Sequence, residues 1–134
     1  MSERPDPRRR DLVKCEDMRL YAERACAFLA GRAFAEYAAD DMLQAAVTRC
    51  VEVIGEAARL VSTPTRRRAG EIPWALIVGM RNVLAHDYAG VNQDKVYEVV
   101  TRHLPALIEH LKPLIRALEA DVGWSDEEDH PGGA

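Results

Sequence analysis

Residues 73–88 read PWALIVGMRNVLAHDY, and the fold prediction starts from the helix that they indicate. Pro73 suits the first turn of a helix, and the residues after it are apolar on nearly every side of a 3.6-residue period. A helix from Trp74 to about His86 is therefore predicted, and it should be central and buried. The exception is one face on which the side chains are first small and then polar: Ala75, Gly79, Asn82 and His86.

Arg81 stands within an apolar stripe of this predicted helix, where an unpaired guanidinium would be costly. Arg81 and His86 should point about 140° apart, because five residues at about 100° each separate them. One regular helix cannot aim both at a single atom. Either the helix unwinds near His86, or a second copy of the chain completes the site. A structural role is also open, with Arg81 in a buried salt bridge and His86 favoured by the helix dipole.

Apolar residues recur at helical spacing upstream of this stretch. A first helix is predicted to begin near Asp11, a good N-cap residue. A second should begin after Asp40 or Asp41 and end before Pro64. Its predicted apolar stripe consists of Val47, Cys50, Val51, Ile54, Ala58 and Val61. Residues 64–72 then form a polar connection.

The last helix is predicted to start near Asn92 or Asp94. Its leucines alternate spacings of four and three residues, which fits antiparallel packing in a bundle. Pro105 and Pro113 lie within it, and each should kink or divide the helix.

Length and composition agree with an all-α, four- to five-helix up-and-down bundle. The chain has 134 residues, of which 48% are hydrophobic and only 6% aromatic, so one domain that is richer in helix than in sheet is expected. Residues 1–10 are predicted to be a flexible lead and residues 11–120 the helical domain. Residues 121–134 should be an acidic, disordered tail.

The net charge of −4 hides an uneven distribution. Residues 119–134 hold six acids and no Lys or Arg, so the rest of the chain carries 18 bases against 16 acids. A mildly basic body permits an RNA substrate without demanding one.

Several other classes of protein are not expected. No segment approaches the roughly 18 apolar residues that span a membrane, and the N-terminus lacks the apolar core of a secretory signal, which predicts a cytoplasmic protein. Cys15, Cys26 and Cys50 show no metal-ligand spacing and are expected to be reduced thiols, buried as small apolar side chains. His103 and His110 should lie about 10.5 Å apart along a helix, too far to share one metal. Neither a metal site nor a cofactor is predicted.

The stretch from Pro73-Trp74 through Gly79-Met80 to Tyr88 resembles the HepT family of the HEPN ribonuclease superfamily. The motif of that family is Arg, four residues, His, one residue and Tyr, and it is matched by Arg81, His86 and Tyr88. Asn82 matches the polar residue that commonly follows the Arg. The resemblance covers about residues 11–118.

The resemblance implies a helical homodimer in which two motifs meet across the interface. It also implies a toxin that cleaves RNA without a metal. The family's antitoxin is MntA, a minimal nucleotidyltransferase that transfers AMP from ATP to the motif tyrosine, here Tyr88. Arg66 to Arg68 would contact RNA or this antitoxin, or they form a solvated loop.

The residue types suit RNA cleavage by the ribose 2′-OH. His86 would act as the base, since histidine has a pKa near neutrality. Arg81 would stabilise charge on the phosphate, and Asn82 would orient His86 or the phosphate. The products would be a 2′,3′-cyclic phosphate and a 5′-OH end.

Two other functions remain open on the sequence. The chain could be a non-catalytic partner of a minimal nucleotidyltransferase that binds a nucleotide or substrate near Tyr88. It could also be a structural helical dimer in which Arg81 and His86 specify the interface.

Overall fold

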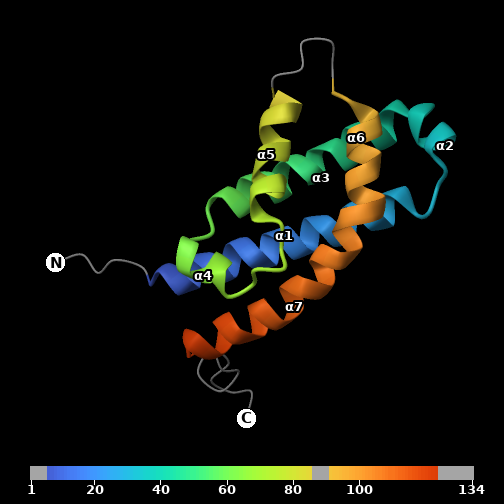
Figure 1. Cartoon of the computed structure of the whole chain (residues 1–134). Helices are drawn as coiled ribbons and strands as arrows, with labels where there is room; N and C mark the ends of the chain where they lie inside the picture. The colour runs from blue at the N-terminus through green and yellow to red at the C-terminus, as the bar shows by residue number, and fades with distance from the viewer. Residues whose placement is uncertain (1–5, 86–90, 124–134) are drawn as a thin grey trace.

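The computed structural model describes residues 6–85 and 91–123, and within those ranges every regular element is helical. The long helix α1 (Pro7–Leu29) lies between α3 (Asp41–Arg59) and α7 (Leu104–Asp121), as Figure 1 shows. The predicted all-α bundle is confirmed. None of the helices in the described ranges has both the length and the apolar character to cross a bilayer.

Helix α1 begins at Pro7, four residues before the predicted start. The Asp6 carboxylate accepts a hydrogen bond from the Arg8 amide, and Pro7 occupies the first turn, where no amide donor is needed. The prediction that Asp11 caps this helix is therefore wrong. The three arginines after Pro7 belong to the helix itself.

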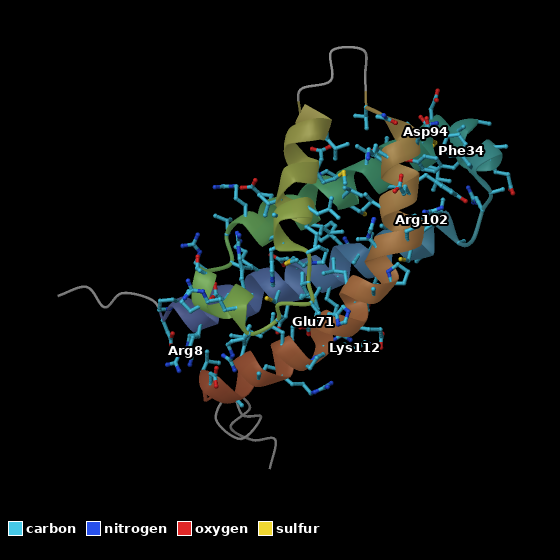
Figure 2. All side chains as sticks on the ribbon, in the orientation of Figure 1. Arg8, Phe34, Glu71, Asp94, Arg102 and Lys112 are labelled. Carbon is cyan, nitrogen blue, oxygen red and sulfur yellow. The ribbon has the colours of Figure 1, made fainter. Side chains whose placement is uncertain are left out.

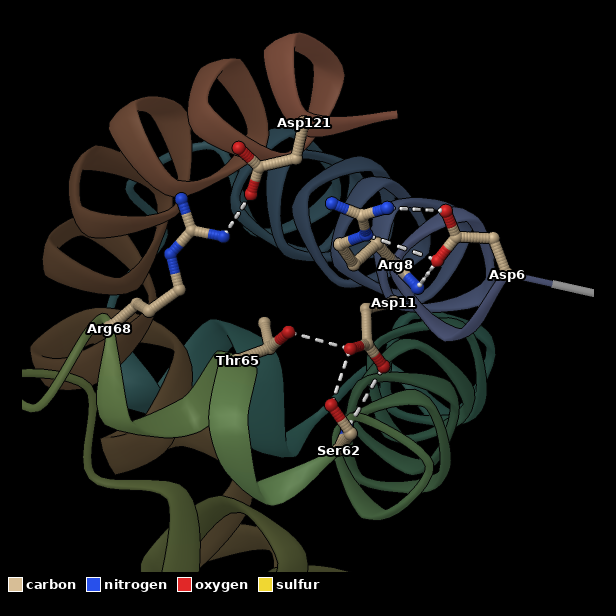
Figure 3. A network of polar contacts seen from close by, with 7 residues as sticks. All are labelled: Asp6, Arg8, Asp11, Ser62, Thr65, Arg68 and Asp121. Atoms are coloured by element: carbon tan, nitrogen blue, oxygen red, sulfur yellow. Dashed lines mark hydrogen bonds and ion pairs between the residues drawn. The ribbon is translucent and has the colours of Figure 1, made fainter. Parts of the chain in front are cut away.

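Asp11 instead joins α1 to the short helix α4 (Thr63–Arg67), as Figure 3 shows. Its side chain is 2% exposed. It accepts hydrogen bonds from the Ser62 amide at 2.9 Å, the Ser62 hydroxyl at 2.5 Å and the Thr65 hydroxyl at 2.6 Å. A carboxylate buried in this way is tolerated because its oxygens are satisfied by donors.

Helix α3 confirms the predicted second helix. Asp40 is its N-cap and accepts a hydrogen bond from the Leu43 amide. The residues of its predicted apolar stripe are all buried: Val47, Cys50, Val51, Ile54, Ala58 and, just beyond its end, Val61.

The connections between the long helices contain helices that the sequence analysis missed. Helix α2 (Phe34–Ala38) follows α1, and α4 occupies part of the connection predicted over residues 64–72. Pro64 lies at the start of α4, where it favours a helix rather than ending one. Both helices have five residues, too few to show a periodic apolar pattern.

The last predicted helix consists of α6 (Gln93–Glu98), the π-helix η1 (Val99–His103) and α7 in unbroken succession. Asn92, one of the two predicted starting points, caps α6. The π-helix ends two residues before Pro105, which has no amide donor for a regular α-helical bond. Pro113 does not divide α7, whose leucines on either side are buried in the core.

Helix α5 (Trp74–Ala85) packs chiefly on α3 and is not enclosed, contrary to the prediction that it is central and buried. Trp74, Met80 and Leu84 are buried, but Leu76 is 45% exposed. A helix that is apolar on every side can be buried, but the pattern does not show that other helices of the same chain pack against every side.

The cysteines agree with the prediction of buried thiols at two of three positions. Cys15 and Cys50 are buried, Cys26 is half-buried, and all three are free. Burial raises the pKa of the Cys15 thiol to about 12, so its reactive thiolate is scarce at neutral pH.

We expect Asp11→Ala to lower the free energy of unfolding by about 2–4 kcal/mol, because three donors on Ser62 and Thr65 lose their charged acceptor. Urea unfolding followed by circular dichroism measures the change. Glu23→Ala is the control, since its pair with Arg19 is exposed on the same helix, and it should change stability by less than about 0.5 kcal/mol. Equal losses in the two variants would contradict the role given to Asp11.

Candidate functional site

The predicted motif lies at the C-terminal end of α5. The backbone of Arg81 and Asn82 belongs to the last turns of this helix. The side chains of these two residues lie outside the described part of the molecule, as do His86 and Tyr88 entirely. Whether the four residues come together stays a prediction, and the described surroundings define the site.

The start of α5 is fixed by Trp74. Its indole nitrogen donates a hydrogen bond to the Ala69 carbonyl at 3.1 Å, and the Arg66 guanidinium lies 5.7 Å from the ring centroid. Met80 and Leu84, both buried, face α3 farther along the helix. The direction of α5, and so the position of its last turn, follows from these contacts.

The outward side of α5 consists of small or half-buried residues. Ala75 is exposed, and Val78 and Gly79 are only half-buried. A Cβ atom added at Gly79 would meet nothing within 4 Å. Within the chain, nothing in the described ranges therefore packs closely over this part of α5.

Hollows lie on both flanks of α5. On one flank an open cleft of about 490 Å³ is bounded by α1, α3 and Leu84 of α5. On the other flank a narrow apolar groove runs between α5 and the η1–α7 junction, and its walls include Leu76, Met80 and His103. In the part of the chain that the structure describes, no three His, Cys, Asp or Glu residues lie close enough to hold a metal ion.

Comparison with known families shows which family the chain belongs to. The profile of the family described as "Ribonuclease HepT-like" matches residues 18–114, which include α5 and most of the bundle. The chain belongs to the HepT-like ribonuclease family. The resemblance inferred from the motif is thereby confirmed.

Individual relatives agree with the family assignment. A protein named "Putative RNase" from Caldanaerobacter subterraneus is 33% identical over 95 residues, covering 68% of this chain and 85% of the relative. A "Probable ribonuclease HepT" from Thermococcus cleftensis is 35% identical over 74 residues, covering 55% of this chain and 67% of the relative. No solved structure matches the chain significantly.

In this HepT-like chain, α6 begins five residues after Tyr88 of the motif. A chain of hydrogen bonds joins its first residue, Gln93, to Tyr37 of α2 and Thr48 of α3. The side-chain carbonyl of Gln93 accepts from the Tyr37 hydroxyl, and its amide donates to the Thr48 hydroxyl at 3.3 Å. Burial raises the pKa of Tyr37, while a hydrogen bond with Thr48 opposes that rise. The hydroxyl therefore stays protonated and able to donate at neutral pH.

An aromatic cluster surrounds this hydrogen-bond chain. The rings of Phe34 and Tyr97 meet edge to face at 5.3 Å, and Tyr37 lies 5.6 Å from Tyr97. Figure 2 shows Phe34 and Asp94 at the same end of the molecule, where α2 meets α6. Sequence reasoning found only the cap at Asn92 here, because the partners are 45 and 56 residues away from Gln93.

The predicted basic stretch Arg66 to Arg68 divides into different roles. Arg66 donates to the carbonyls of Ala58 and Val61 at 3.0 Å, which satisfies the C-terminal end of α3. Arg68 forms an ion pair with Asp121, while Arg67 is exposed on the surface. Arg66 is thus a structural residue.

We expect Arg66→Ala to lower the free energy of unfolding by about 1–3 kcal/mol, since the carbonyls of α3 and the Trp74 ring lose a charged partner. Arg67→Ala is the matched control and should change stability by less than about 0.5 kcal/mol. Thermal unfolding of both variants provides the comparison. If Arg66→Ala were as stable as Arg67→Ala, Arg66 would not be what anchors α5.

Proposed function

We propose that this chain is the toxin endoribonuclease of a toxin–antitoxin pair and cleaves RNA without a metal. Membership of the HepT-like family, with Arg81, His86 and Tyr88 at the motif spacing, carries the proposal. The position of the backbone of Arg81 and Asn82 in the last turns of α5, where Leu84 lines an open cleft, supports it. The proposal places the reaction in the cytoplasm, where RNA and ATP are available.

The proposed chemistry uses the nucleophile that RNA itself carries. His86 removes the proton of the ribose 2′-OH as this oxygen attacks the adjacent phosphorus. Arg81 stabilises the negative charge that develops on the phosphate oxygens, and Asn82 orients the reacting groups. The bond from phosphorus to the 5′ oxygen breaks and this oxygen takes up a proton from water, which leaves a 2′,3′-cyclic phosphate and a 5′-OH end, while His86 returns its proton to solvent.

Tyr88 is the proposed point of control. A nucleotidyltransferase antitoxin similar to MntA would transfer AMP from ATP to its phenolic oxygen and release pyrophosphate. The added nucleotide brings bulk and negative charge to the place where the RNA phosphate binds, and both oppose substrate binding.

The active form is proposed to be a homodimer in which two motifs approach each other. The open side of α5 around Ala75 and Gly79 supports this assembly, because small residues let a second helix come close. A second copy would also remove the geometric conflict between Arg81 and His86, which a single regular helix points in different directions.

We expect the purified chain, confirmed by intact mass to be unmodified at Tyr88, to cleave total RNA in the presence of EDTA. Cleavage should leave cyclic-phosphate ends, and His86→Ala should reduce the rate by about 10²–10⁴-fold, the usual contribution of a general base. DNA, which lacks the 2′-OH, should stay intact. Gel analysis with end-group determination gives all three results.

A control for folding accompanies this assay. His86→Ala should keep the helical circular dichroism spectrum of the unaltered chain. If the folded, unmodified chain leaves total RNA intact, general ribonuclease activity is excluded. Nucleotide-dependent binding to a nucleotidyltransferase without turnover would then favour the non-catalytic partner.

The dimer has a separate test at Gly79. Gly79→Leu meets open space within the chain, and leucine is a better helix former, so the protomer should keep its fold. If this face is the interface, the dissociation constant of the dimer should rise at least about tenfold by sedimentation equilibrium, because tight packing tolerates little added volume. Gly70→Leu is the matched control, since Gly70 also faces open space. Equal dimerisation of both variants would contradict the proposal.

A further inference from the structure

The cleft beside the last turn of α5 has the size of a small-molecule site. Its volume is about 490 Å³, within the range of about 300–1,000 Å³ that ligand sites commonly have. Side chains from three helices, α1, α3 and α5, line it. It therefore connects the motif helix to the body of the bundle.

The floor of the cleft is apolar. Val53, Ala57 and Leu60, from α3 and its C-cap, line it together with Leu84 of α5. Ala57 and Leu84 are buried, and Val53 and Leu60 are half-buried. A surface of this kind suits the flat face of a nucleobase, which is poorly hydrated and packs on apolar groups.

Two cations stand at the rim. Lys14 of α1 has no carboxylate partner within 4 Å among the described residues. Arg49 of α3 is 3.8 Å from Glu52, but its side chain is 71% exposed, so this ion pair is weak and easily exchanged. Both can therefore bind a phosphate without breaking a strong interaction.

Carboxylates stand at the same rim. Asp17 lies one turn after Lys14 on α1, and Glu52 lies across from it on α3. Glu56 also lines the cleft, but it forms an ion pair with Arg59 at 2.8 Å. Ionised carboxylates are acceptors only, so they recognise N–H donors and repel a run of phosphates.

This combination of groups favours one nucleotide over a long polyanion. An apolar floor takes a base, Lys14 or Arg49 takes a single phosphate, and Asp17 or Glu52 accepts a hydrogen bond from an amino group on the base. Adenine, guanine and cytosine carry such exocyclic amino groups, whereas uracil has none. The acids thus give the cleft a means of discriminating between bases.

We propose that this cleft binds one nucleotide of the RNA substrate, next to the scissile phosphate, and prefers a base with an exocyclic amino group. The inference rests on the proposed ribonuclease function for its substrate. Leu84 places the cleft at the motif, since the backbone of Arg81 precedes it by about one helical turn on α5. A base seated on Leu84 would hold its own phosphate close to that turn.

The test measures binding of nucleoside 5′-monophosphates to the full chain by NMR titration, without any cleavage. AMP, GMP or CMP should shift the backbone amides of Lys14, Val53 and Leu84 and bind about tenfold more tightly than UMP, because a hydrogen bond to a carboxylate is lost with uracil. Lys14→Gln should weaken the binding of all four nucleotides. Lys95→Gln, on the exposed side of α6, is the matched control and should change nothing.

The specificity claim has its own variants. The double variant Asp17→Asn with Glu52→Gln should abolish the preference over UMP, since an amide offers a donor as well as an acceptor, while Asp94→Asn at the α2–α6 end should keep it. Val53→Phe should fill the cleft and weaken the binding of all four nucleotides. Shifts confined to amides outside the cleft, or equal binding of UMP, would overturn the inference.

Failure of the inference can be told apart from failure of the proposed function. RNA cleavage that depends on His86, together with no nucleotide binding at the cleft, would refute the cleft and leave the ribonuclease standing. Nucleotide binding with the predicted preference, without RNA cleavage, would support the cleft as a nucleotide site and refute the ribonuclease.

Discussion

The Arg66 guanidinium joins the end of one helix to the start of the next, and the placement of the motif helix depends on it. It satisfies carbonyls at the C-terminal end of α3 and lies over the Trp74 ring at the beginning of α5. Because α5 then packs on α3 through Met80 and Leu84, both hollows beside it are defined by the same contacts. A residue that looked available for RNA is thus part of the scaffold.

Long periodic helices could be predicted from the sequence, and short or long-range features could not. The apolar stripe of α3 and its cap at Asp40 sufficed for that helix, and the start of α6 followed from Asn92. The prediction for Asp11 was wrong because a helix cap is recognised from neighbouring residues. The Asp11 carboxylate instead accepts hydrogen bonds from residues 51 and 54 positions away in the sequence. Helices α2 and α4 are too short for a period to show.

The candidate site divides in the same way. The sequence pattern placed Arg81 and Asn82 on one helix, and the structure shows that this helix, α5, packs chiefly on α3. The cleft was not predictable, since Lys14, Arg49 and Leu84 come from three segments that only the fold brings together. The burial predicted for α5 failed for a related reason. An apolar periodic pattern shows which side chains of a helix favour burial, but it does not show what packs against them.

The π-helix η1 has a consequence for how this chain can tolerate change. A π-turn holds one residue more than an α-turn, so η1 absorbs one extra residue while the faces of α6 and α7 stay aligned. Losing a single residue between Val99 and His103 would therefore let the helix run regularly and leave α6 facing α2 and α3. Losing a residue from the regular turns of α6 or α7 would instead rotate one part of the helix against the other by about 100°. Within α6, such a loss would carry Gln93 away from Tyr37 and Thr48. The irregular turn is the point in this continuous helix where a change of length by one residue disturbs the packing least.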